Sequence, residues 1–305
     1  MSKPRTFKIR VPASTSNCGP GFDTLGIALN LYNHLTLTLA DGGAVEYAGD
    51  LPDFHPSALQ MVRKAAETFF NKAGIAPFGF TFDVEGDVPR ARGLGSSVTL
   101  RAGILAGLNA AAGEPMTRKQ LVSLVSLLEG HPDNAAAAVL GGFCVARTCP
   151  DTGRFLDALR FDVGSDLSFV VVSPDKEVLT ATSRTSLPLQ LPFFDVVKSL
   201  NSLAYIVSVF AVGDYERLRH GVTDFLHQPT RVPGINGARE AIAAGLDSGA
   251  YTGWLSGSGS SVLCAGPAET AKAVGEAMAG AFAEWDTESR VYLLKADNEG
   301  LHLGG

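Results

Sequence analysis

The chain contains, at residues 88–97, the stretch Val88-Pro89-Arg90-Ala91-Arg92-Gly93-Leu94-Gly95-Ser96-Ser97. A helical pattern without proline follows directly, from Val98 to Ala112. The free N–H groups and the dipole of a first helical turn attract an anion, and glycines let the backbone approach it closely. Ser96 and Ser97 add hydroxyls that can cap the helix or reach phosphate or metal. The stretch therefore predicts either a phosphate-binding loop or a capped helix after a tight turn.

Familiar nucleotide-binding signatures are absent from the sequence. It has no Gly-x-x-x-x-Gly-Lys-Ser/Thr, and no Gly-x-Gly-x-x-Gly follows a strand, which disfavours a P-loop enzyme and a Rossmann dehydrogenase. The protein-kinase motifs His-Arg-Asp and Asp-Phe-Gly and the Gly-x-Ser-x-Gly elbow are also missing. Phosphate chemistry in this chain must therefore use another scaffold.

Bulk properties describe an ordinary globular protein. A chain of 305 residues with 46% hydrophobic and 18% charged residues more often forms two domains than one. Its net charge of −6 argues against a nucleic-acid partner. The first eight residues are polar and we find no later apolar run long enough to cross a bilayer, so we expect a cytoplasmic protein without a membrane partner. No Cys-x-x-Cys pair occurs among the four cysteines, which disfavours a disulfide framework and a metal knuckle.

Two further glycine-rich segments accompany the loop at 93–97. The first runs Pro12-Ala13-Ser14-Thr15-Ser16-Asn17-Cys18-Gly19-Pro20-Gly21-Phe22-Asp23-Thr24-Leu25-Gly26, and the last runs Leu255-Ser256-Gly257-Ser258-Gly259-Ser260-Ser261. In order and rough spacing the three segments resemble the three motifs of the GHMP kinases, and we call them motifs one, two and three. Within that superfamily the chain resembles the homoserine kinases, through Glu129-Gly130-His131-Pro132-Asp133-Asn134, Thr182-Ser183-Arg184 and His227-Gln228-Pro229-Thr230-Arg231. The resemblance spans nearly the whole chain.

The fold expected from this resemblance is α+β, the two-lobed GHMP kinase fold. It implies a ribosomal protein S5 domain 2-like, ATP-binding N-terminal lobe at 1–164 and a ferredoxin-like C-terminal lobe at 165–305. The residue patterns also predict two mixed lobes. The strands expected from them are 6–11, 34–39, 79–84, 169–172, 261–265 and 290–296, and the helices are 57–72, 98–112, 117–129, 195–210 and 269–285.

The resemblance also implies a nucleotide site and a metal site. The expected nucleotide-binding residues are Pro89, Arg92, Gly93, Leu94, Gly95, Ser96, Ser97, Ser256, Gly257 and Gly259. Ser97 and Glu129 are expected to hold Mg²⁺, which takes hard oxygen ligands and completes its six with phosphate and water. By position alone, Glu129 would be a solvated acid in the last turn of a helix.

The acceptor site should suit homoserine, a small zwitterion with a hydroxyl tail. Arg184 and Arg231 are the candidates for its carboxylate, and Asp23 with Asn17 for its ammonium and hydroxyl end. The resemblance gives His131 mainly a role in shaping the substrate pocket. It names Glu129, Asp133 and Asn134 as the catalytic residues, the last two beside the acceptor hydroxyl. Whether a side chain or the γ-phosphate itself accepts the hydroxyl proton stays open.

Three departures from the family pattern are visible. Ser260 stands where the family usually has proline, which puts the rigidity of motif three in doubt. Arg101 replaces a small or aliphatic residue; added charge near the phosphates is one reading of it, but we expect it to face outward. Ala135-Ala136-Ala137 replaces the more common Val-Ala-Pro. By composition motif three reads as a flexible connector, but the apolar segments on both sides favour a tight loop inside a domain.

The resemblance implies an ATP- and Mg²⁺-dependent kinase that converts L-homoserine to O-phospho-L-homoserine in threonine biosynthesis, as a homodimer. Two alternatives remain at this point. One is a GHMP kinase that acts on another small alcohol. The other is a catalytically silent homologue that binds ligand as a regulator, against which the retention of Ser97, Glu129 and motif one argues.

Overall fold

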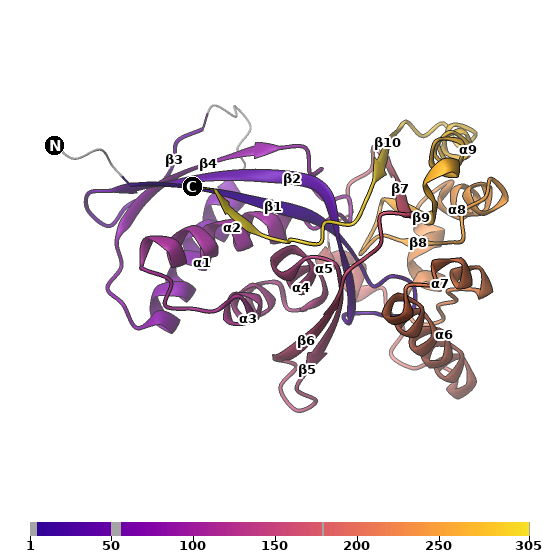
Figure 1. Cartoon of the computed structure of the whole chain (residues 1–305), viewed down its shortest axis with the longest axis horizontal. Coiled ribbons are helices and arrows are strands. Elements are labelled where there is room, and N and C mark those ends of the chain that lie inside the picture. The colour runs from indigo at the N-terminus through magenta and orange to yellow at the C-terminus, as the bar shows by residue number, and fades with distance from the viewer. Residues whose placement is uncertain (1–4, 50–55, 179, 305) are drawn as a thin grey trace.

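The computed structural model describes residues 5–49, 56–178 and 180–304, and Figure 1 shows the two lobes that they form. The polar start of the chain at residues 1–4 lies outside this range. Strands of the first lobe form one sheet in the order β11-β1-β2-β4-β3, with β5 paired to β2 and β6 to β5. Its members are β1 (Thr6–Ser16), β2 (Leu25–Ala40), β3 (Val45–Tyr47), β4 (Gly79–Gly86), β5 (Phe143–Thr148), β6 (Phe155–Phe161) and β11 (His302–Gly304).

Helices cover this sheet and build the first core with it. They are α1 (Pro56–Ala73), α2 (Ser96–Ala111), α3 (Arg118–Glu129) and α4 (Asp133–Leu140). α2 packs against β1 and β2, where Gly103 and Gly107 lie against Leu35 and Leu37. α3 begins with a capping box, in which the Thr117 and Gln120 side chains bond each other's backbone N–H groups.

The second lobe is built on a sheet of order β10-β7-β9-β8. Its strands are β7 (Leu167–Pro174), β8 (Thr252–Leu255), β9 (Val262–Pro267) and β10 (Ser289–Leu294), and its helices are α5 (Thr180–Thr185), α6 (Phe193–Val212), α7 (Gln228–Arg231), α8 (Ala238–Asp247) and α9 (Ala271–Ala283). Short 3-10 turns occupy Tyr215–His220, Val232–Gly234 and Ala268–Thr270. The α+β class with two lobes is confirmed, and every predicted strand and helix overlaps an observed one.

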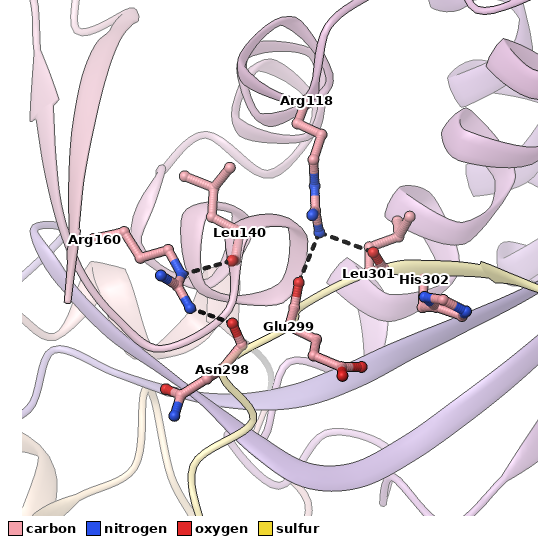
Figure 2. Close-up of a pocket in the computed structure, with 7 residues that line it drawn as sticks. All are labelled: Arg118, Leu140, Arg160, Asn298, Glu299, Leu301 and His302. Carbon is pink, nitrogen blue, oxygen red and sulfur yellow. Dashed lines mark hydrogen bonds between the residues drawn. The ribbon is translucent and has the colours of Figure 1, made fainter. Parts of the chain in front are cut away.

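The last strand returns to the first lobe, where β11 pairs antiparallel with β1. Two arginines fasten the segment before it (Figure 2): Arg118 donates to the carbonyls of Glu299 at 2.9 Å and Leu301 at 2.8 Å, and Arg160 donates to the carbonyls of Asn298 and, at 3.0 Å, Leu140. A small hollow of about 510 Å³ lies between these residues. Because backbone carbonyls already take their donors, we assign both arginines a structural role.

The end of β1 lies where the lobes meet. Ile9 and Val11 on its first half pack in the core of the first lobe, and a register shift follows between Pro12 and Ala13. Ala13 belongs to a second cluster, which joins residues of β2 to Phe169 and Trp254 of the second sheet. Motif one continues from this strand, so it is held between the lobes.

The helix α6 corrects one expectation from the sequence. By length and composition alone it is apolar enough to span a bilayer, whereas we expected no such run. One helix of this kind is weak evidence for a membrane span, because core helices pass the same test. Ile206, Val209 and Phe210 on α6 are buried in the core, whereas Phe194 and Leu200 are exposed.

Candidate functional site

A cavity of about 970 Å³ lies between the lobes. Motif one, motif two, the segment after α3, and helices α5 and α7 all contribute to its wall. One part of the wall is mainly apolar and includes Ala58, Met61, Val98 and Leu100. Another part is polar and includes Asn17, Asp23, His131, Asn134, Arg184 and Arg231. A cavity of this size and mixed lining is typical of a small-molecule site.

Motif two forms the entrance to α2 as predicted. Gly93 and Gly95 have φ angles of +74° and +73°, in the left-handed region that favours glycine. A Cβ on Gly95 would lie 2.5 Å from Ser14 Oγ. The first α-helical bond runs from Thr99 N to Gly95 O at 2.9 Å, and no side chain of the described part of the chain caps the helix. The N–H groups of the first turn are thereby left for a ligand, and residues 95–98 line the cavity.

The other nucleotide-binding residues predicted in and before motif two, Pro89, Arg92 and Leu94, differ in whether they line the cavity. Arg92 lines the cavity, and its guanidinium pairs with Asp175 at 2.6 Å. Leu94 is fully buried, and its carbonyl accepts from Ser14 N at 3.1 Å. Pro89 is half-buried and, like Leu94, is absent from the wall of the cavity formed by described residues.

Motif three is a buried loop that joins the other two motifs, so the reading as a flexible connector is wrong. Ser256 Oγ donates to Gly93 O at 2.7 Å, and Gly257 N donates to Ser16 O at 3.2 Å. Ser260 is fully buried, and its hydroxyl donates to the carbonyl of Lys176, which fixes the position usually held by proline. Of the residues predicted here to bind nucleotide, Gly257 lines the cavity, as does Ser258, which was not predicted. Ser256 and Gly259 are not among the described residues that line it, and both pack within the loop.

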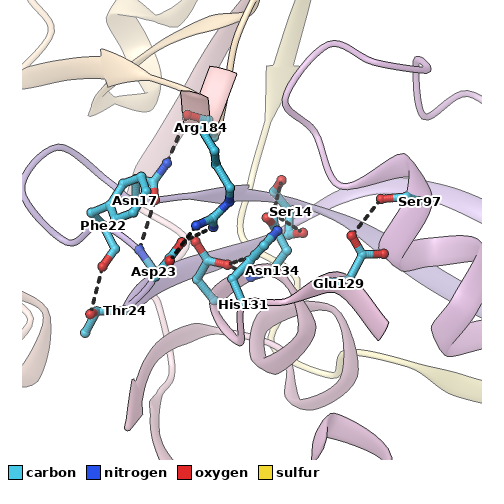
Figure 3. A network of polar contacts seen from close by, with 12 residues as sticks. Ser14, Asn17, Phe22, Asp23, Thr24, Ser97, Glu129, His131, Asn134 and Arg184 are labelled. Carbon is cyan, nitrogen blue, oxygen red and sulfur yellow. Dashed lines mark hydrogen bonds and ion pairs between the residues drawn. The ribbon is translucent and has the colours of Figure 1, made fainter. Parts of the chain in front are cut away.

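Glu129 is buried beside the first turn of α2. Its carboxylate Oε2 accepts from Ser97 Oγ at 3.1 Å (Figure 3), and its Oε1 is in an ion pair with Arg101. The side chain of Glu129 is 8% exposed and that of Arg101 17%. Both the solvated last-turn acid and the outward-facing Arg101 are therefore wrong, because tertiary packing of α3 on α2 buries the two side chains together.

The donor set at Glu129 fits a divalent cation. Among the described residues, Glu129 Oε1 is buried without an aligned hydrogen bond, although Arg101 lies close enough for an ion pair. Glu129 and Ser97 both line the cavity and offer hard oxygens, which suit Mg²⁺. Asp23, His131 and Asp133 also place ligand atoms within 4.8 Å of one another, but Arg184 and His131 already pair with these carboxylates.

At the polar end, motif one meets α5. Asn17 donates to Gly257 O at 2.9 Å and accepts from Asp23 N at 3.1 Å, which fixes the turn. Arg184 donates twice to the Asp23 carboxylate, at 3.0 and 2.5 Å (Figure 3). Burial alone would lower the pKa of Arg184, but Asp23 raises it overall. The two residues expected at opposite ends of the substrate thus contact each other.

Arg231 is a buried guanidinium that has no close anion among the described side chains. It is 7% exposed, and its described hydrogen bonds, to Ser183 O, Gly257 O and His227 Nδ1, measure 3.4 to 3.5 Å. No carboxylate of the described residues lies within ion-pair distance of it. Burial, followed by the nearby Arg184, lowers its pKa. Such a group is poised for an incoming carboxylate.

His131, Asp133 and Asn134 form one network at the start of α4. His131 Nδ1 donates to Asp133 Oδ1 at 2.6 Å, and Asn134 Nδ2 donates to Ser14 Oγ at 2.9 Å. Burial alone would lower the pKa of His131, but the Asp133 carboxylate raises it overall. Burial alone would raise the pKa of Asp133, but His131 lowers it overall. The pair therefore favours a charged imidazole and a weakly basic carboxylate.

Sequence reasoning missed Phe22 and Ser14 as parts of the site. The guanidinium carbons of Arg184 and Arg231 lie 5.2 and 5.1 Å from the centroid of the Phe22 ring, a distance typical of cation–π contacts. Ser14 N donates to Leu94 O and Ser14 Oγ accepts from Asn134 Nδ2, so Ser14 links motif two to the start of α4. Both residues lie within motif one, which was the only available signal.

Comparisons with known proteins agree with this geometry. The family described as GHMP kinases N terminal domain matches residues 60–142. A homoserine kinase of Moorella thermoacetica is 36% identical over 96% of this chain and 98% of its own length. The crystal structure of a homoserine kinase from Cytophaga hutchinsonii superposes with a TM-score of 0.88 at 26% identity, covering 100% of this chain and 99% of that one. A mevalonate diphosphate decarboxylase from Enterococcus faecalis, 16% identical with a TM-score of 0.71 and 98% coverage of both chains, shares the fold.

The identity and coverage of these relatives decide the family. This chain belongs to the homoserine kinases of the GHMP kinase superfamily.

Proposed function

We propose that this protein transfers the γ-phosphoryl group of ATP to the hydroxyl of L-homoserine, forming O-phospho-L-homoserine for threonine biosynthesis. The observation that carries the substrate assignment is the buried guanidinium of Arg231, which lines the cavity and has no carboxylate of the described residues within ion-pair distance. Next to it, Arg184 and Asp23 supply one positive and one negative group. This set complements an amino acid that carries both a carboxylate and an ammonium.

In this proposal the triphosphate binds at the first turn of α2. The free N–H groups there and the left-handed Gly93 and Gly95 support a close approach of phosphate oxygens. Ser97 and Glu129 would hold Mg²⁺, which neutralises charge on the phosphate oxygens when bound. The apolar wall that includes Met61 and Leu100 has the chemistry expected for the nucleotide base.

Homoserine occupies the polar end of the cavity. Arg231 binds its carboxylate with Arg184, and Asp23 turns from Arg184 toward the ammonium. Asn17, fixed by Gly257, completes this end. A planar guanidinium can donate two parallel hydrogen bonds to a carboxylate, whereas a lysine ammonium cannot.

Asp133 and Asn134 position the acceptor hydroxyl. The lowered pKa of Asp133 makes it a weak proton acceptor at neutral pH. Transfer through a loose transition state depends more on alignment and charge neutralisation than on early deprotonation. The hydroxyl proton therefore passes to the transferred phosphoryl group as it leaves ADP, while His131 holds Asp133 in place.

We propose further that the enzyme works in the cytoplasm, without a nucleic-acid or membrane partner, as a homodimer. Exposed apolar residues along α6, including Phe193, Phe194 and Leu200, support association of two copies. Sedimentation of the wild type and of Leu200→Glu tests this point. A wild-type monomer at micromolar concentration would contradict it.

A coupled assay of ADP release across several acceptors tests the function. With saturating Mg·ATP, we expect turnover with L-homoserine to exceed that with mevalonate, shikimate or galactose by orders of magnitude. A preference for another acceptor would assign the fold to a different small alcohol. Lack of turnover with every acceptor would favour the silent regulator.

A further inference from the structure

Arg101 is a charged residue at the phosphate end of the cavity for which the proposed reaction gives no role. It lies four residues after Ser97 on α2, so both side chains project from the same face of the helix. Its Nη1 pairs with Glu129 Oε1, while Ser97 Oγ donates to Oε2. Each carboxylate oxygen of Glu129, the expected metal ligand, is thus in contact with a different side chain of α2.

The contact with Arg101 comes from behind the cavity wall. Ser97 and Glu129 line the cavity, but Arg101 is not part of the lining formed by the described residues. Its Nε is buried and, like Glu129 Oε1, has no aligned hydrogen bond to any described residue. The pair therefore gains from the attraction of charges rather than from a well-aligned hydrogen bond.

A buried carboxylate needs a counter-charge even when no metal is bound. Arg101 supplies it, and the ion pair holds the Glu129 carboxylate in place. A divalent cation that binds Glu129 then meets a carboxylate whose charge is partly neutralised, and it also meets repulsion from the guanidinium.

We propose that Arg101 is a resident counter-cation of Glu129 that weakens metal binding to the site, so that the metal enters with the nucleotide phosphates. Arg101 is in this sense a positioning residue that acts through Glu129. The inference rests on the proposed function, because it takes Glu129 as the metal ligand.

Binding of Mn²⁺, measured by electron paramagnetic resonance with and without ADP, tests the proposal on the purified full-length protein. Arg101→Met removes the charge at similar length and should tighten Mn²⁺ binding about fivefold or more, the lower end of common couplings between two ligands of one site. Arg101→Gln is a second neutral variant in case the methionine protein folds poorly. Arg101→Lys restores the charge and should return the affinity to within about twofold of wild type.

A control and a reference variant separate the outcomes. Arg10→Met removes a guanidinium from the exposed pair with Glu299 and should leave Mn²⁺ affinity unchanged. Unchanged or weaker binding in the neutral Arg101 variants would overturn the counter-cation role, as would equally tight binding in Arg101→Lys. If Glu129→Gln leaves Mn²⁺ binding intact, the metal site of the proposed function fails, and this result is distinct from failure at Arg101 alone.

Discussion

Replacement of Arg231 by lysine tests how the site recognises its substrate. The guanidinium is buried and lines the cavity, and its hydrogen bonds to the described residues are long and reach neutral groups, so none of these contacts ties it to a protein anion. Lysine keeps the charge but cannot make the planar bidentate hydrogen bonds of a guanidinium to a carboxylate. Loss of a hydrogen bond to a charged group costs roughly 1.5 to 3 kcal/mol, so kcat/KM for homoserine should fall roughly tenfold to a hundredfold.

The assay compares two acceptors under identical ATP and Mg²⁺ concentrations. Homoserine carries the carboxylate, and 3-aminopropan-1-ol is the same molecule without it. Arg231→Lys should reduce kcat/KM for homoserine and leave the slow phosphorylation of the amino alcohol nearly unchanged. Arg160→Lys is the matched control, because Arg160 fastens backbone carbonyls outside this cavity.

An equal loss of kcat/KM for both acceptors would show that Arg231 does not bind the substrate carboxylate. Arg231 would then serve the nucleotide or the fold. The corresponding change at Arg184 is expected to behave differently, because Arg184 already pairs with Asp23. Its loss would release Asp23 as well as one substrate contact.

Three further predictions concern the metal, the phosphates and the histidine. Glu129→Gln should lower turnover on the order of a hundredfold or more and leave homoserine affinity nearly intact, measured by calorimetry; near-normal turnover at saturating Mg²⁺ would contradict the role. Gly95→Val should crowd Ser14 and weaken ATP binding more than homoserine binding. Gly113→Val, also at a positive φ (+83°) but with nothing within 4 Å of its Cβ, should leave ATP binding unchanged. Equal ATP affinities of Gly95→Val and the wild type would disprove phosphate binding at the first turn of α2. By NMR, the pKa of His131 should lie above the ordinary 6.5 in the wild type and below 6.5 in Asp133→Asn, because Asp133 overcomes the effect of burial. The stabilisation of the fold from the raised pKa is full below pH 6.5 and fades as the pH rises through the folded-state pKa. An unchanged pKa of His131 in Asp133→Asn would refute the pairing.

Local chemistry explains what the sequence could predict. A cluster of glycines before a helical pattern requires left-handed backbone and free N–H groups, and the loop at 93–97 has both. Alternating residues predicted the strands at 6–11 and 79–84, because one face of each is buried in the core of the first lobe. These features depend on neighbours a few residues apart.

Other features depend on contacts that no local pattern records. The α4 helix has only eight residues, and β11 only three, and both are held by partners far along the chain. Arg101 reads as an exposed helical arginine until the packing of α3 on α2 brings Glu129 to it. Asp23 and Arg184 are 161 residues apart, so their pairing follows from the meeting of the two lobes.

In the proposed reaction this cavity directs a phosphoryl group to the hydroxyl of homoserine. Phosphorus NMR of the enzyme with Mg·ATP and L-homoserine is the decisive experiment for this reaction, because it identifies the product as well as its rate of formation. We expect ADP together with a phosphomonoester whose phosphorus couples to the two protons of the terminal methylene of homoserine. Release of inorganic phosphate without that phosphomonoester would contradict it.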